Sequence, residues 1–157
     1  MKLDYVQALK RVNEARGAWI IHGQEPLLEQ NLLDTFRKAW QQQEVERQRY
    51  DISSVNDWKN VFNALNSLSL FSQQLAIEVH GNIKPDANGL KQLKSYIQHN
   101  EHNLLLIVLP KQDSSSLKSA FFQVVEANGV VVPLTATYPQ DRQRILSIEA
   151  DKLGIQL

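Results

Sequence analysis

The chain has 157 residues, 43% of them hydrophobic, with 17 basic and 17 acidic residues that cancel in net charge. This length and apolar content suit one globular domain with a substantial core. The balanced charge excludes an overall attraction to nucleic acid or to an anionic membrane. The chain has no cysteine, which excludes disulfides and thiolate metal sites, and no apolar run of the ~20 residues that span a bilayer. We therefore expect a soluble, cytoplasmic protein with no membrane segment.

The apolar pattern of the first half alternates between the helical period and short continuous runs, which is typical of an α/β fold. The polarity of residues 47–52 indicates an edge strand, whereas residues 18–22 are apolar enough for a strand buried on both faces. The expected elements are helices over 4–15, over 26–41 and from 56 or 57 through 65, and strands over 18–22 and 47–52.

The second half continues the alternation, and its most apolar segment, residues 104–109, ends at Pro110. We place this segment at the centre of a mostly parallel five-stranded sheet flanked by helices. We expect this domain to cover residues 1–137, and a helix over 140–153 to begin a second domain. The other expected elements are strands over 75–79 and 129–133, a loop over 81–89, and helices over 90–98 and from a cap at 114–116 through Val125.

The loop after the first strand is where a phosphate site would lie in such a sheet. A P-loop needs several glycines, a lysine and a Ser/Thr for magnesium, whereas residues 23–30 hold one glycine, no lysine and the acidic Glu25. The central strand ends in Val108 and Leu109, not in the acidic residues that would hold magnesium. We therefore predict no nucleotide-binding residue and no cofactor.

Other groups of polar residues have simpler explanations than a catalytic or metal-binding site. His99 and His102 could share a metal with Glu101, but the carboxyl end of a helix favours histidine without one. The serines at 114–116 lack the glycines of a hydrolase elbow and are expected to cap a helix. We predict no catalytic residue and no metal ligand.

Four basic residues could form a strip for nucleic acid, but acidic residues lie among them, which favours an ordinary solvated surface. They are Arg37, Lys38, Arg47 and Arg49. Tryptophans at apolar positions are expected in the core, and these are Trp19, Trp40 and Trp58.

Residues 67–72, Ser-Leu-Ser-Leu-Phe-Ser, interrupt the amphipathic pattern of the helix before them. Leu68 lies three residues after Leu65 and can continue its buried stripe. Leu70 and Phe71 cannot both do so, because neighbours on a helix point about 100° apart. From periodicity alone, these side chains either complete the core or bind a partner.

Three stretches together resemble the amino-terminal part of the delta subunit of bacterial DNA polymerase III, the clamp-loader family. They are residues 20–28, with Gly23, an acidic residue and Pro-Leu-Leu; residues 57–71, an Asp-Trp helix leading into Ser-Leu-Phe; and the apolar residues 104–108. The second stretch is the most specific, and the order and spacing of the three cover nearly the whole chain.

The resemblance implies an AAA+-like domain that has lost its nucleotide site. It implies that Leu70 and Phe71, with Leu68 beside them, insert into a hydrophobic pocket of the beta sliding clamp and help to open the ring for loading onto primed DNA. The subunit would be non-catalytic, and the DNA-directed DNA polymerase activity, a nucleotidyltransfer, would reside in another subunit.

Delta subunits continue with a lid domain and a helical collar that assembles the loader, and residues 138–157 resemble the start of the lid. We therefore expect a fragment that is monomeric, binds the clamp, and would meet other clamp-loader subunits only in the longer protein. Two alternatives stay open: a nucleotide-dependent ATPase or switch domain of the same fold, and a DNA-binding module near Arg47.

Overall fold

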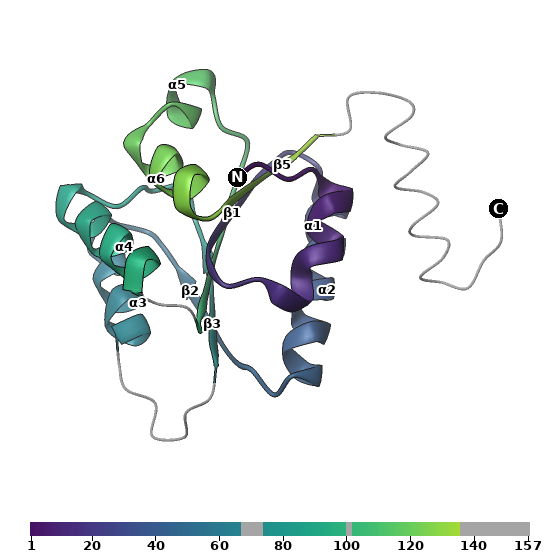
Figure 1. Ribbon diagram of the computed structural model, residues 1–157. Helices are drawn as coiled ribbons and strands as arrows, with labels where there is room; N and C mark the ends of the chain where they lie inside the picture. Colours follow the sequence, from purple (N-terminus) through teal and green to yellow (C-terminus); the bar gives the residue numbers. More distant parts are fainter. Residues whose placement is uncertain (67–73, 100–101, 136–157) are drawn as a thin grey trace, which may run out of the picture.

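A computed structural model describes residues 1–66, 74–99 and 102–135 of the chain (Figure 1). Its centre is one five-stranded sheet in which every pair of neighbouring strands is parallel, in the order β2-β3-β4-β1-β5. This confirms the predicted fold class, the central place of residues 104–109 and the edge position of the second strand. The strands are β1 Gly17–Gly23, β2 Glu46–Asp51, β3 Leu75–His80, β4 Leu104–Leu109 and β5 Val130–Leu134.

Helices cover both faces of the sheet, as Figure 1 shows. The first layer is α1 Tyr5–Arg11 with the 3₁₀ turn η1 Val12–Glu14, and α2 Pro26–Gln42. The second layer is α3 Asp57–Asn66, α4 Ala87–His99 and α6 Ala120–Asn128, and the one-turn helix α5 Ser114–Leu117 precedes α6. None of these helices, in the part of the chain that the structure describes, is long and apolar enough to cross a bilayer.

The central strand β4 separates two hydrophobic cores. Leu104, Leu106 and Val108 pack toward α1 and α2, whereas the alternate residues of β4 pack toward α3, α4 and α6. All six residues of β4 are buried. The three tryptophans lie in these cores as predicted, with Trp19 and Trp40 in the first and Trp58 in the second.

Two helix boundaries differ from the sequence-based expectation because aspartates act as caps. The predicted helix starting at 114–116 is two helices, and its cap is Asp113, whose carboxylate accepts the Ser116 N–H at 2.7 Å. Helix α4 begins at Ala87, three residues earlier than expected, because Asp86 accepts the Gly89 N–H at 2.8 Å. Apolar periodicity locates the buried turns of a helix but not its capped first turn.

One charged residue, Glu78, is fully buried in the otherwise apolar strand β3. Arg37 of α2 donates to both carboxylate oxygens, at 3.1 and 2.8 Å, and Arg47 of β2 does the same at 3.2 and 3.3 Å. His80 Nε2 lies 2.6 Å from Oε2. A single carboxylate therefore ties the edge strand β2 to helix α2. Arg37 and Arg47 are thus ion-pair partners of a buried acid and not part of the plain solvated strip that we expected.

Glu78 gives the fold a dependence on pH. Burial raises the pKa of its carboxyl, but the hydrogen bonds from His80, Arg37 and Arg47 outweigh burial and hold the pKa well below its usual range. The folded-state pKa is thus lower than the unfolded one, so this stabilisation is present above about pH 4.3 and is lost as the pH falls below that value.

We expect Glu78→Gln to lower the free energy of unfolding at pH 7 by roughly 3 kcal/mol, because it leaves two arginines facing an uncharged group. Below about pH 5, the stability of the variant should also fall less steeply than that of the wild type. Urea unfolding at several pH values measures both effects. The control is Asp34→Asn, which removes the charge of an exposed carboxylate 3.9 Å from Arg37 and keeps an oxygen that can accept from Gln30. It should change stability by less than about 1 kcal/mol. Equal losses of unfolding free energy in Glu78→Gln and Asp34→Asn would contradict this account.

The end of β1 packs closely on β5. Gly23 has a φ of +152°, and a Cβ built there would lie 2.5 Å from the Leu134 carbonyl oxygen. Gly17, at the other end of β1, has a φ of +78° but no atom within 4 Å of such a Cβ. Both glycines therefore have a positive φ, which side chains of L-residues rarely adopt, and they differ in steric room.

We expect Gly17→Ala to cost about 1 kcal/mol, the strain of a left-handed alanine alone. Gly23→Ala should cost more, roughly 3 kcal/mol, because the new methyl group also forces β1 and β5 apart. Urea midpoints of the two variants measure the difference. A loss of stability in Gly23→Ala no larger than that in Gly17→Ala would show that the close approach of β1 and β5 does not add to the cost.

Candidate functional site

The carboxyl ends of β1, β4 and β5 surround a pocket of about 350 Å³. Ligands usually bind at these ends of the strands in α/β folds, and we call this side the carboxyl edge of the sheet. Its walls include His22 and Gly23 from β1, and Lys111 and Gln112 from the segment after β4. Burial and the nearby Lys2 lower the pKa of His22, so its imidazole is neutral at pH 7.

The start of α2, at this pocket, is a poor anion site. Glu25 occupies the N-cap position without a side-chain capping bond, and Pro26 follows without an N–H. A carboxylate at this position repels phosphate, and Lys111 is the one cationic residue among those that line the pocket. The prediction that this edge holds no nucleotide stays a prediction, and calorimetry tests it below.

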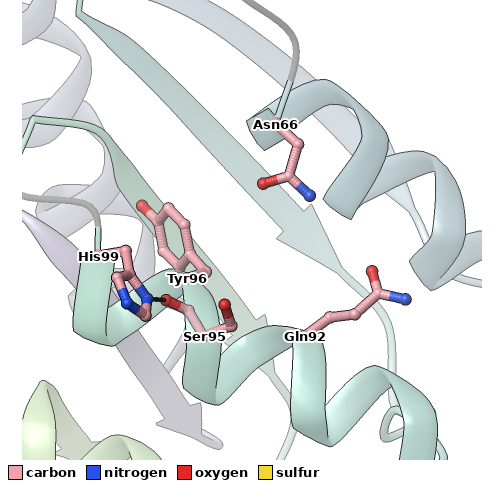
Figure 2. Close-up of a pocket in the computed structure, with 5 residues that line it drawn as sticks. All are labelled: Asn66, Gln92, Ser95, Tyr96 and His99. Carbon is pink, nitrogen blue, oxygen red and sulfur yellow. Dashed lines mark hydrogen bonds between the residues drawn. The ribbon is translucent and has the colours of Figure 1, made fainter.

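A second hollow lies at the amino ends of the strands, which we call the amino edge of the sheet. It is found between the carboxyl ends of α3 and α4 (Figure 2). We call it the α3–α4 groove; its volume is about 250 Å³. Its lining is polar, with Asn66 contributed by α3 and Gln92, Ser95, Tyr96 and His99 by α4.

Helix α3 is fixed in place by its buried stripe and by a hydrogen bond from Trp58. Trp58, Val61, Phe62 and Leu65 are all at most 4% exposed. The Trp58 indole N–H donates to the Ile83 carbonyl oxygen at 2.8 Å. The last turn of α3 is thus held by core packing, and Asn66 at its end is exposed beside the groove.

Helix α4 is anchored to the sheet beneath it. Leu93 is fully buried, and the buried Tyr96 hydroxyl donates to the Gly17 carbonyl oxygen at 3.0 Å. Burial raises the pKa of Tyr96, so its hydroxyl keeps the proton that this bond needs. Core packing and these hydrogen bonds therefore hold both helices of the groove in place.

The histidine of the groove has a local structural role. His99 Nδ1 lies 2.9 Å from the Ser95 carbonyl oxygen one turn earlier. Among the described residues, no three His, Cys, Asp or Glu side chains gather closely enough to hold a metal ion. Glu101, the third member of the metal group that we considered, lies outside the described residues. The metal alternative therefore gains no support.

The predicted clamp-binding residues Leu68, Leu70 and Phe71 lie outside the described residues, within 67–73. The structure does place the two ends of this segment. Asn66 ends α3 at the groove, and Leu75 begins β3 at the amino edge of the sheet. These two described residues therefore lie on the side of the sheet opposite to the carboxyl-edge pocket.

Sequence reasoning missed the polar residues of the groove. Gln92 and Ser95 look like any solvent-facing positions of an amphipathic helix, and Asn66 looks like a residue near a helix end. Only the packing of α3 against α4 brings them together, and no spacing in the sequence reports that packing. The three stand as additional candidate site residues.

Comparison with known proteins identifies the family. The sequence signature described as "DNA polymerase III, delta subunit" matches residues 19–135. No curated protein sequence matches the chain significantly. Among solved structures, the Bacillus subtilis DNA clamp loader delta protein is similar, with a TM-score of 0.66 and 8% identity over 94% of this chain and 47% of that one. The chain thus spans about half the length of the Bacillus protein.

Two further structures share the fold. Trip13 from Rhizobiales has a TM-score of 0.56 at 10% identity, covering 94% of this chain and 56% of its own. The Aeropyrum pernix ORC1 protein, solved in complex with DNA, has a TM-score of 0.52 at 11% identity, covering 92% and 48%. These likenesses show an AAA+, P-loop-like fold. Together with the sequence match over most of its length, they show that the chain belongs to the DNA polymerase III delta subunit family.

Proposed function

We propose that this chain is the clamp-binding part of a clamp-loader delta subunit and that it binds the beta sliding clamp through Leu68, Leu70 and Phe71. The observation that carries the proposal is the family match over residues 19–135, which includes these three positions. The position of α3 supports it, because a fixed helix leads directly into the segment that bears them.

The proposed role needs no catalysis by this chain. In this proposal residues 1–137 form the clamp-binding domain and residues 138–157 begin the lid. Its further partners are other clamp-loader subunits and, indirectly, primed DNA. Binding stabilises an open ring only if the open ring offers better contacts than the closed one. The apolar anchors must therefore act together with other contacts that differ between the open and the closed ring.

The test is a calorimetric titration of a bacterial beta clamp with the wild type and with a variant that carries Leu70→Ala and Phe71→Ala. Each side chain that is buried in a partner contributes roughly 1.5–3 kcal/mol, so the double variant should bind at least about 100-fold more weakly. The matched control is Leu27→Ala, which removes a leucine that is 63% exposed at the opposite edge of the sheet. Undiminished binding by the double variant would reject the proposed site.

A nucleotide-dependent switch is the second candidate, because the carboxyl-edge pocket lies where this fold usually holds a ligand. Titration of the protein with ATP and magnesium decides between this nucleotide switch and the clamp-binding role. We expect no saturable heat, since Glu25 and Pro26 replace the donors that a phosphate needs. A saturable binding heat that Lys111→Ala weakens would establish the switch candidate instead.

The third reading, a DNA-binding module near Arg47, gains no support from the geometry. Arg37 and Arg47 bind Glu78, and Arg49 lies 3.1 Å from the carboxylate of Asp51. Arg37 and Arg47 thus face a buried carboxylate and Arg49 an exposed one, so the three offer less to a phosphate backbone than unpaired arginines would.

A further inference from the structure

The α3–α4 groove presents hydrogen-bonding groups that the protein itself does not use. Within the residues that the structure describes, the side-chain amides of Asn66 and Gln92 and the hydroxyl of Ser95 have no hydrogen-bond partner, although all three border the groove. Figure 2 shows these side chains around one hollow, with Asn66 opposite the α4 residues. They are thus available to a molecule from outside.

The lining carries amides and hydroxyls, which both donate and accept hydrogen bonds, and one imidazole. The Ser95 carbonyl can only accept a hydrogen bond, so the His99 Nδ1 that contacts it carries a proton and donates. Each amide offers both a donor and an acceptor. Because neither a lysine or arginine nor a carboxylate lines the groove, it matches neither a phosphate nor a metal ion. Alternating donors and acceptors without charge are the pattern of polypeptide backbone.

The location of the groove indicates which polypeptide. Asn66 forms one wall and is the last described residue before 67–73, so the groove borders the point where the chain enters this segment. The volume of about 250 Å³ is smaller than the roughly 300–1,000 Å³ of small-molecule pockets and suits a short piece of extended chain.

We propose that the α3–α4 groove binds a short extended backbone segment of the same partner that Leu70 and Phe71 engage, through the amides of Asn66 and Gln92. This inference rests on the proposed function and extends it, because it supplies a second, polar contact beside the apolar anchors. Such a contact fixes the orientation of the partner on the domain, which two apolar side chains alone leave loosely determined.

Helix α4 offers a matched pair of variants for the test. Gln92→Ala removes an amide from the groove, and Gln98→Ala removes the same group from an exposed position about 120° around the helix. Alanine favours helix at both positions, so neither variant should lose its fold. The probe is a bacterial beta sliding clamp, titrated at low salt and at about 0.3 M salt.

We expect Gln92→Ala to weaken clamp binding about three- to tenfold, the loss of a neutral hydrogen bond, and Gln98→Ala to bind like the wild type. The ratio between Gln92→Ala and wild type should be the same at both salt concentrations, because the amide of Gln92 carries no charge.

Other outcomes separate the two proposals. If the Leu70→Ala/Phe71→Ala variant loses binding while Gln92→Ala binds like Gln98→Ala, the groove inference is wrong and the proposed function stands. If the ratio changes with salt, or if Gln92→Ala weakens binding of a primed DNA duplex instead of the clamp, the backbone assignment is also wrong. If the wild type does not bind the clamp, both proposals are rejected.

Discussion

The central strand β4 is hydrogen-bonded on both sides by parallel neighbours, β1 and β3, and all six of its residues are buried. A parallel sheet of this kind must be covered on both faces, and each parallel connection must cross from one edge of the sheet back to the other. The helices that make these crossings run antiparallel to the strands. Their carboxyl ends therefore gather at the amino edge of the sheet, which is where α3 and α4 form their groove.

This arrangement separates two regions with different chemistry. The carboxyl edge keeps the pocket that AAA+-like folds place there, with Glu25 and Pro26 at the start of α2. The amino edge carries a polar groove beside the entry to residues 67–73. In the proposed function, partner binding uses the amino edge, and the sheet between the two edges acts as the rigid support. The bond from Tyr96 to Gly17 and the buried stripe of α3 provide that rigidity on the binding side.

Hydrophobic patterning was sufficient to predict the layers, four of the strands and the central position of residues 104–109, because burial on two faces leaves a continuous apolar run. The fifth strand, β2, was predicted at the edge from the polarity of residues 47–52. It could not predict the Glu78 cluster, since a lone acid in an apolar strand and two arginines elsewhere in the chain meet only after α2 and β2 pack together. It also could not predict the groove, whose polar residues resemble ordinary surface positions. The proposed anchors were identified by the breakdown of periodicity at Leu70 and Phe71, and by a family resemblance that the comparisons support.

Hydrogen–deuterium exchange on the protein, alone and mixed with a bacterial beta sliding clamp, tests the central claim most directly, because it maps the bound surface without any substitution. The account predicts slower exchange in residues 67–73 and in the last turns of α4, with β2 and the start of α2 unchanged. Protection confined to the carboxyl edge around Gly23 and Lys111, with none in residues 67–73 or in α4, would contradict it.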